Sequence, residues 1–231
     1  MRLLVVAAEP REFPGILAHA TGVKPAAFPV HWARTGRLGD HDVALVANGA
    51  GARRAGAAVE SALEHFAADA VISTGFCGAL APELRLADVV VASAVIAGAR
   101  RFEALQPVAT PQHHQGVVCC IDHVAGTAAE KLELRASGAS VVEMEAVGVA
   151  DRAVAHGVPF YCIRVVTDLA GEDMANDFNG ALRPDGHFAT ISILRDALRN
   201  PWARLPELFR LRNRCAHAAR VLGEFIADCR F

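Results

Sequence analysis

The chain has 231 residues, 53% of them hydrophobic, and carries a formal net charge of −2. This composition permits a sizeable buried core, and the length fits one undivided domain over residues 1–231. The charge argues against a chain-wide electrostatic surface for nucleic acid or for membranes, and no apolar run reaches the roughly 18 residues that a membrane span needs. The apolar run 3–8 is too short for a signal peptide, and the six cysteines form no CxxC pair. We therefore expect a cytoplasmic protein with reduced thiols.

Apolar runs alternate with helical patterns along most of the chain. We expect strands at 3–8, 30–34, 41–47, 70–74, 88–96, 116–121, 140–142 and 160–166, and helices at 11–20, 52–66, 127–135, 145–156, 188–199 and 203–228. Gly22 is expected to close the first helix, and two polar stretches, 100–115 and 173–185, are predicted to be irregular loops. The alternation predicts an α/β fold, a three-layer αβα sandwich around a central mixed, largely parallel sheet.

Three acidic residues lie where strands end and helices begin. Glu143 and Glu145 stand at the start of a predicted helix, and Asp168 follows Thr167 at the end of the strand 160–166. Taken singly, each acid fits a helix cap or a turn. Open α/β sheets place their chemistry at the carboxyl ends of strands, so the three acids together indicate one catalytic crevice.

Two glycine-bearing segments, 48–51 and 75–78, follow strands and are predicted to be tight turns that a ligand can approach closely. A purely structural turn explains either segment equally well. The chain has no GxGxxG, GxxxxGK[ST] or GxSxG motif, which argues against dinucleotide, nucleoside triphosphate and serine-hydrolase chemistry. His113, His114 and His123 lack helical ligand spacing, so we expect neither a metal site nor a cofactor.

These motifs, in this order, resemble the family-one purine and uridine phosphorylases, which include the methylthioadenosine/S-adenosylhomocysteine nucleosidases. The matching segments span most of the chain: Ala8-Glu9-Pro10-Arg11-Glu12, Asn48-Gly49-Ala50-Gly51, Ser73-Thr74-Gly75-Phe76-Cys77-Gly78-Ala79-Leu80, Val142-Glu143-Met144-Glu145-Ala146 and Ile163-Arg164-Val165-Val166-Thr167-Asp168. The Glu-Met-Glu motif with a downstream Arg-x-x-Thr-Asp is the most specific of them.

The resemblance implies cleavage of the N-ribosidic bond of a purine nucleoside, with adenine the expected base. It implies that Asp168, helped by Thr167, protonates the leaving base, that Glu145 binds the ribose, and that Glu12 activates water. Acid catalysis of this kind contributes about 10²–10⁴-fold, and an anionic carboxylate stabilises an oxocarbenium-like transition state. By the same resemblance, the remaining substrate-binding or supporting residues are Glu143, Met144, Phe76, Cys77, Gly78, Val124 and Arg164.

The chain departs from the family pattern at the nucleophile and base positions. Phosphorylases hold phosphate with an arginine and a hydroxyl residue where this chain has Ser73 and Phe76, which favours water as the nucleophile. Val124 stands where the nucleosidases stack an aromatic side chain on adenine. Phosphorolysis remains the main alternative, with a phosphate site built differently, from Arg53, Arg54, Arg100 or Arg101.

The carboxyl half also resembles the hopanoid-associated branch, the adenosylhopane nucleoside phosphorylases, at Asp177-Phe178-Asn179 and in the long helical end. That likeness implies a lipid-linked 5′ group and an apolar 5′ site, for which Phe102, Leu105, Phe178 and Leu182 are candidates. Folding of these side chains onto the core is the alternative. A non-catalytic nucleoside-binding protein is the alternative from another class. The family implies a homo-oligomer.

Overall fold

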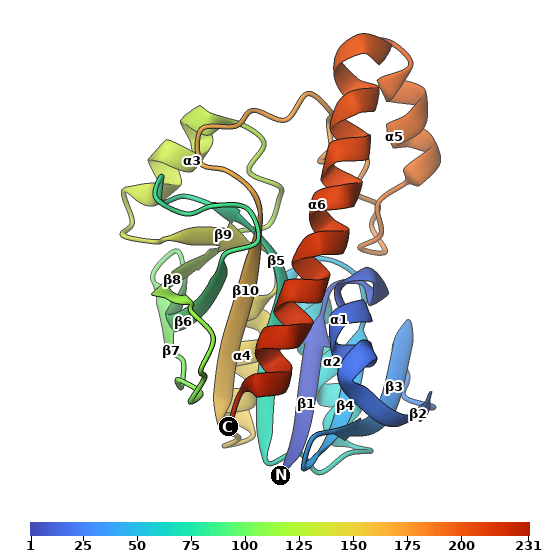
Figure 1. Cartoon of the computed structure of the whole chain (residues 1–231), viewed down its shortest axis with the longest axis vertical. Helices are drawn as coiled ribbons and strands as arrows, with labels where there is room; N and C mark the ends of the chain where they lie inside the picture. Colours follow the sequence, from blue (N-terminus) through green and yellow to red (C-terminus); the bar gives the residue numbers. More distant parts are fainter.

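The computed structural model describes all 231 residues, and ten strands form one mixed sheet (Figure 1). The strands are β1 (Arg2–Ala7), β2 (Ala20–Pro25), β3 (Trp32–Leu38), β4 (His41–Ala47), β5 (Ala70–Ala79), β6 (Val89–Ala97), β7 (Arg100–Glu103), β8 (His114–Cys120), β9 (Val141–Glu143) and β10 (Phe160–Asp168). The helices are η1 (Pro10–Glu12), α1 (Pro14–His19), α2 (Ala52–Leu63), α3 (Ala128–Arg135), α4 (Ala146–Ala155), α5 (Thr190–Ala197) and α6 (Pro201–Asp228). None of these helices has the length and apolar character to cross a membrane.

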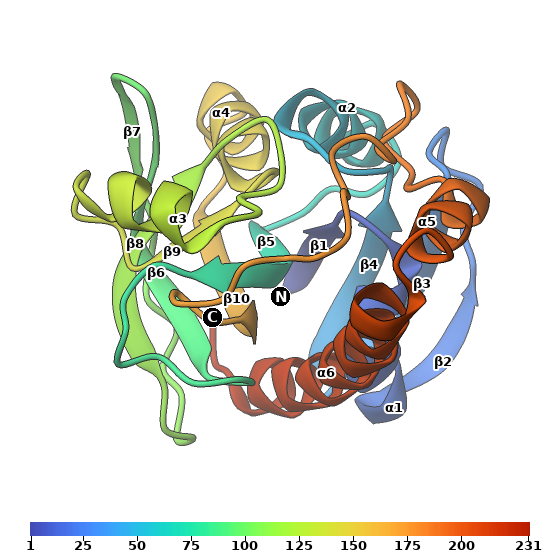
Figure 2. The ribbon, with the colours of Figure 1, turned by 90° about the horizontal axis from the view of Figure 1, so that it is seen from above.

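The centre of the sheet is parallel, with β4, β1, β5 and β10 side by side. One half of the sheet closes on itself, because β10 pairs with β6 as well as with β5, and β8 and β9 complete the ring back to β5 (Figure 2). The other half continues from β4 through the antiparallel strands β3 and β2. The continuous apolar runs of β1, β5 and β10 follow from cover on both faces of the sheet.

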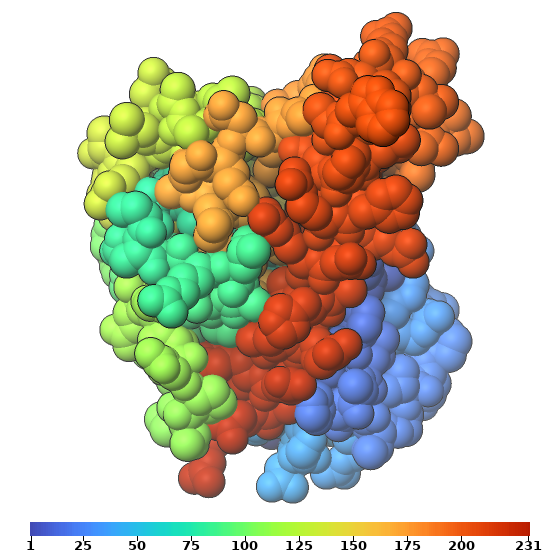
Figure 3. All heavy atoms as spheres, turned by 45° about the horizontal axis from the view of Figure 1, so that its top comes forward, coloured from blue at the N-terminus to red at the C-terminus, as the bar shows by residue number.

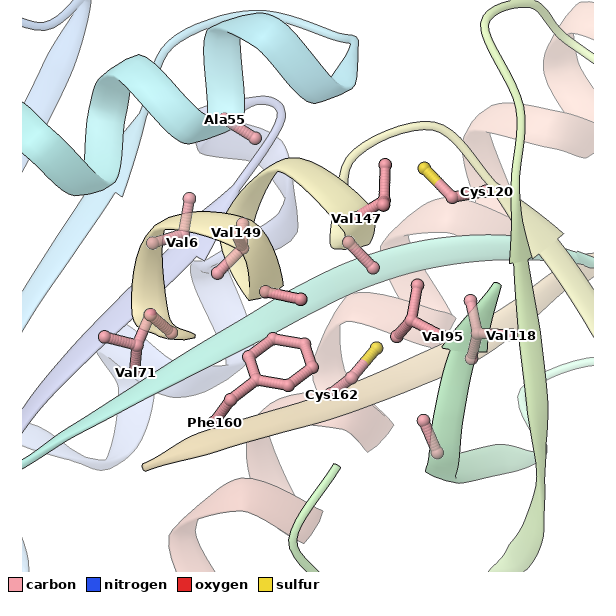
Figure 4. Close-up of a cluster of buried hydrophobic side chains, with 14 of the residues drawn as sticks. Val6, Ala55, Val71, Val95, Val118, Cys120, Val147, Val149, Phe160 and Cys162 are labelled. Atoms are coloured by element: carbon pink, nitrogen blue, oxygen red, sulfur yellow. The ribbon is translucent and has the colours of Figure 1, made fainter. Parts of the chain in front are cut away.

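Helices cover the two faces, which confirms the predicted three-layer arrangement. On one face, α2 and α4 enclose a core that includes Val6, Ala55, Val149 and Phe160 (Figure 4). On the other face, α1 and α6 enclose a second core, which includes Phe13, Leu222 and Phe225. A Cβ atom on Gly15 of α1 or on Gly223 of α6 would collide with the backbone of the opposite helix. Two glycines therefore let α6 lie tightly along α1.

Four local predictions were wrong. The expected helix 11–20 divides into η1 and α1 at Pro14, which lacks the N–H that would continue the first turn, and Gly22 lies inside strand β2. The expected loop 100–115 begins with a strand, β7, which pairs with β6. Segment 75–78 is no turn: β5 runs through it to Ala79, because β10 pairs beside it along that whole length.

Candidate active site

A cavity of about 970 Å³ lies between α6 and the carboxyl ends of β1, β9 and β10. Ten of the eleven predicted site residues line it, and the eleventh, Arg164, is buried behind it. The lining residues among them are Glu12, Phe76, Cys77, Gly78, Val124, Glu143, Met144, Glu145, Thr167 and Asp168. The sequence motifs thus converge on one crevice, as the ends of neighbouring strands predicted.

Glu12 is oriented by the backbone at both ends of its carboxylate. Oε1 accepts a hydrogen bond from the Phe76 N–H at 2.9 Å, and Oε2 accepts one from the Glu9 N–H at 2.7 Å. Gly75, at φ +137°, permits this approach, since a Cβ there would overlap the Glu12 carboxylate. Burial raises the pKa of Glu12, while the two backbone hydrogen bonds oppose that rise. A buried, oriented carboxylate with a raised pKa suits a general base.

Glu143 is held in a structural role between a helix start and a buried cation. Its carboxylate accepts hydrogen bonds from the N–H groups of Glu145 and Ala146, which open α4. It also forms a fully buried ion pair with Arg164, at 2.6 Å. Arg164 in turn donates to the Ser73 hydroxyl at 2.6 Å, so its guanidinium supports the cavity floor from behind. The capping interpretation holds for Glu143.

Glu145 reaches across the cavity to the turn before α2. Its Oε1 accepts a hydrogen bond from the Gly51 N–H at 2.9 Å. Burial, together with the nearby negative charge of Glu143, raises the pKa of Glu145 to about 8. Since only one bond to protein is present, the carboxyl group retains free acceptor capacity toward the cavity.

The raised pKa of Glu145 predicts a pH-dependent gain in stability for Glu145→Gln. The folded state holds the proton up to about pH 8, whereas the ordinary value is 4.5. Stability from this group is therefore complete below pH 4.5 and is lost as pH rises toward 8. In alkaline buffer we expect Glu145→Gln to have a higher Tm than the wild type, because its free energy of unfolding is larger by more than about 1.4 kcal/mol. In acid the two proteins should have nearly the same Tm. Equal Tm differences across the pH range would contradict the assignment.

Asp168 and Thr167 end β10 beside the middle of the cavity. Asp168 is the register partner of Gly78, and an irregularity between Val166 and Asp168 re-aims the carboxylate. A Cβ on Gly78 would stand 2.7 Å from Asp168 Oδ2, so only glycine leaves room there. The Thr167 hydroxyl lies 3.1 Å from Oδ1. Burial raises the pKa of Asp168, which suits a group that must hold a proton until it is needed.

Lys131 is the functional candidate that sequence reasoning missed. Its side chain is completely buried, and Nζ donates to Asp168 Oδ2 at 2.6 Å and to the Leu169 carbonyl at 2.8 Å. The ammonium opposes the rise in the pKa of Asp168. One signal was present: Lys131 lies three residues from both Ala128 and Leu134 in a predicted helix, so it shares their inward face.

Lys131→Met is expected to shift the pH dependence of catalysis. Removing the cation beside Asp168 raises the pKa of that carboxyl group further, so Asp168 keeps its proton to higher pH. The alkaline fall in kcat/KM should therefore move upward in pH. Lys24→Met is the matched control, because Lys24 is the other lysine of the chain and is exposed; it should leave the pH profile of kcat/KM unchanged. A uniform loss of kcat/KM at every pH would indicate a merely structural lysine.

A pair of loops closes the cavity on the side away from Glu12. The Asn179 amide accepts a hydrogen bond from the Val124 N–H at 2.7 Å and donates to the Val124 carbonyl at 2.9 Å. The Asn179 side chain thereby pairs with the Val124 backbone as a neighbouring strand would. Phe178, its neighbour, lines the cavity with Val124 and forms an edge-on pair with Phe188. An aromatic ring is thus present near Val124, although from a distant segment.

The other apolar candidates do not reach the cavity. Phe102 packs against the core beside α4, and Leu105 is half exposed. Leu182 does not line the cavity, although its backbone pairs with that of the lining residue Phe188. The β6–β7 hairpin carries the first two away from the strand ends, which the sequence did not reveal. The apolar wall is instead supplied by Ile193 and Leu194 of α5 and by Leu208 and Leu211 of α6.

The arginines considered for a phosphate site also lie outside the cavity lining. Arg100 pairs with Asp151, and Arg101 pairs with Glu103. Arg54 donates to the Pro184 carbonyl. The arginines that do line the cavity are Arg11, Arg212 and Arg220, and Arg11 pairs with Glu9.

The chain belongs to the phosphorylase superfamily, whose sequence model it matches over residues 2–112 and 99–199. It is similar to the 5′-methylthioadenosine/S-adenosylhomocysteine nucleosidase of Tolumonas auensis, 29% identical over 177 residues that cover 62% of this chain and 75% of that one. The namesake from Aeromonas salmonicida is 27% identical over 190 residues, covering 69% of this chain and 83% of its own.

Solved structures of that nucleosidase share the fold. The structure from Campylobacter jejuni superimposes with a TM-score of 0.72 at 16% identity and covers 98% of this chain and 97% of its own. The Streptococcus pyogenes protein in complex with 5-methylthiotubericidin gives 0.67 at 22% identity, covering 92% of this chain and 96% of its own. The nucleoside phosphorylase-like α/β fold expected from the motifs is confirmed.

Proposed function

We propose that this chain hydrolyses the N-ribosidic bond of adenine nucleosides and releases free adenine. The observation that carries the proposal is the convergence of three buried carboxyl groups, Glu12, Glu145 and Asp168, on one cavity. A mere nucleoside-binding protein needs no proton donor. The nucleosidase names of the relatives support the same reaction.

The spacing along β5 suits two groups on opposite sides of one glycosidic bond. Phe76 holds Glu12 and Gly78 pairs with Asp168, and two residues of a strand rise roughly 6–7 Å. A gap on the order of 6.5–9.5 Å leaves room for a water molecule in inverting glycoside hydrolysis. The family resemblance implies that Glu12 is the base and Asp168 the acid, and this spacing fits both roles.

In the proposed step, a water oxygen attacks C1′ of the ribose as the C1′–N9 bond breaks. The bonding pair goes to the purine, Asp168 gives its proton to N7, and Glu12 takes a proton from the water. Glu145 binds the ribose hydroxyls and, when ionised, stabilises the positive charge that develops on the sugar. The products are adenine and the free ribosyl sugar.

Glu145→Gln is expected to weaken both ribose binding and turnover. The amide keeps most of the hydrogen bonding but removes the charge that Glu145 carries above about pH 8, and that charge favours the oxocarbenium-like transition state over the ground state, so the effect is expected in alkaline buffer. Steady-state kinetics on 5′-methylthioadenosine should show kcat falling with KM rising. A change in KM alone would reduce Glu145 to a binding residue.

We further propose that the natural nucleoside carries a large apolar group on its 5′ carbon, as in the hopanoid-associated branch. The cavity is far larger than its catalytic end requires, and Ile193, Leu194, Leu208 and Leu211 form an apolar wall along it. Each buried CH₂ contributes about 0.8 kcal/mol. With 5′-alkylthioadenosines of increasing chain length, kcat/KM should rise steadily; a constant or falling value contradicts the proposal.

Product analysis tests water against phosphate. We expect free ribosyl sugar to form at an unchanged rate without phosphate. Ribose-1-phosphate that forms only when phosphate is added would overturn the hydrolytic reaction and favour phosphorolysis. Release of no base from any nucleoside would favour the binding protein.

We also propose a cytoplasmic homo-oligomer. The six cysteines are all unpaired, which fits a reducing compartment. Val154, next to the last residue of α4, is 64% exposed although it shares a helix face with the core residue Val147, so this end of α4 is available for a second copy. Sedimentation velocity of the wild type measures the oligomeric state, and the same measurement on Val154→Arg tests whether this end of α4 forms the interface. An oligomer that is unchanged in Val154→Arg excludes that end of the helix.

A further inference from the structure

Nearly half of the exposed large hydrophobic side chains of the molecule lie on the α5–α6 hairpin, here defined as residues 190–214. This hairpin stands away from the sheet and its covering helices (Figures 1 and 3). Five of the eleven exposed large hydrophobic side chains of the whole chain lie on it: Ile191, Leu194, Leu198, Trp202 and Phe209. Trp202 is 92% exposed at the turn between the helices. Monomeric proteins rarely gather such side chains in the open without a partner.

The same hairpin is strongly basic, although the chain as a whole is acidic. Residues 190–214 contain six arginines and two acidic residues, a net charge of +4 against −2 for the whole chain. Arg199 and Arg204 share Asp196, and Arg214 pairs with Glu172. No carboxylate lies within ion-pair distance of Arg195, Arg210 or Arg212, all of which are exposed. Three guanidinium groups are therefore free to bind an anionic surface.

The apolar surface of the hairpin continues into the active-site cavity. Leu194 is half exposed and also lines the cavity, and Ile193, Leu208 and Leu211 extend the same apolar surface inward. Whatever the hairpin docks on therefore lies at the mouth of the cavity.

We propose that the α5–α6 hairpin docks the protein on the surface of an anionic lipid bilayer. Exposed tryptophan and aliphatic side chains beside arginines are the composition of segments that lie at the boundary between headgroups and acyl chains. Basic residues near an anionic membrane surface strengthen binding to it. Trp202, Leu198 and Phe209 enter the boundary region, and Arg195, Arg210 and Arg212 bind lipid phosphates.

Charge argues against a second copy of the chain as the occupant. A two-fold dimer sets the same patch of both subunits face to face, so two patches that each carry a net charge of +4 would meet. Such like-charge contacts disfavour a partner. The docking proposal goes beyond the proposed function and does not depend on it, although a bilayer at the cavity mouth gives an apolar 5′ group a direct path inward.

Vesicle binding by the full chain tests the proposal without substrate. We expect co-sedimentation with vesicles of phosphatidylcholine mixed with phosphatidylglycerol, weaker binding as salt increases, and little binding to phosphatidylcholine alone. In a Trp32→Phe background, which leaves Trp202 as the single tryptophan, emission should shift to the blue on binding. The double variant Trp202→Ser/Phe209→Ser should bind at least ~10-fold more weakly, since it loses the burial of two large apolar side chains. Val154→Ser on α4, an apolar position about as exposed as Phe209, is the matched control and should bind like the wild type.

Three results would overturn the proposal. The first is wild-type protein that stays in the supernatant with every vesicle at low salt, and the second is a double variant that binds as tightly as the wild type. The third is a double variant that no longer forms a dimer in sedimentation velocity, because that result would make the hairpin a self-association face. Trp202 and Phe209 do not line the cavity, so turnover of 5′-methylthioadenosine without vesicles should be the same in the double variant and the wild type. That assay separates failure of docking from failure of the proposed reaction.

Discussion

We expect Asp168→Asn to lower kcat for adenine release by about 10²-fold or more, because an amide keeps the size of the carboxyl group but cannot give the proposed proton to N7. The measurement is release of free base from 5′-methylthioadenosine, with the Tm followed in parallel. Near-wild-type turnover by a folded Asp168→Asn protein would rule out Asp168 as the acid.

Lys131 complicates that substitution in a way that a second variant resolves. The ammonium is completely buried against Asp168, so Asp168→Asn leaves a buried cation without its carboxylate. Breaking one side of a buried pair costs about 3–5 kcal/mol, whereas replacing both partners with neutral groups is often tolerated. The double variant Asp168→Asn/Lys131→Met should therefore regain much of the stability and remain inactive. Recovery of activity together with stability would show that only the fold had been lost.

Glu12→Gln removes turnover in phosphate-free buffer, again by about 10²-fold or more, if water is the nucleophile. The glutamine still fills the space. Its NH₂ group cannot accept a hydrogen bond, so one of the two backbone N–H groups that now donate to the carboxylate, those of Glu9 and Phe76, loses its acceptor. A moderate fall in Tm is expected, so circular dichroism must first establish that the variant is folded.

The response of Glu12→Gln to phosphate distinguishes the two reactions. Phosphate carries its own negative charge and needs no general base. Full turnover of the variant on adding phosphate, with ribose-1-phosphate as product, would contradict the assignment of Glu12. Continued inactivity with phosphate present supports hydrolysis.

The sequence predicted best those elements whose surroundings are uniform. Strands β1 and β4 are covered on both faces, so their apolar runs at 3–8 and 41–47 identified them without further information. Strand β2 escaped notice because nearly all of it is exposed at the sheet edge, and only its pairing with β3 makes it a strand. Segment 75–78 has the composition of a turn, but the backbone bonds of β10 beside it keep it extended.

The sequence by itself determined which acids stand at strand ends and helix starts, because hydrophobic periodicity locates those ends and the motifs mark the residues. Only the tertiary structure decided what each acid does there. Glu143 pairs with Arg164, Glu145 accepts a hydrogen bond from the Gly51 N–H, and Asp168 pairs with Lys131. The partners lie 21, 94 and 37 positions apart in the sequence. The pKa of a carboxyl group and its free capacity to accept hydrogen bonds depend on burial and on charges within a few ångströms, and only folding sets those distances.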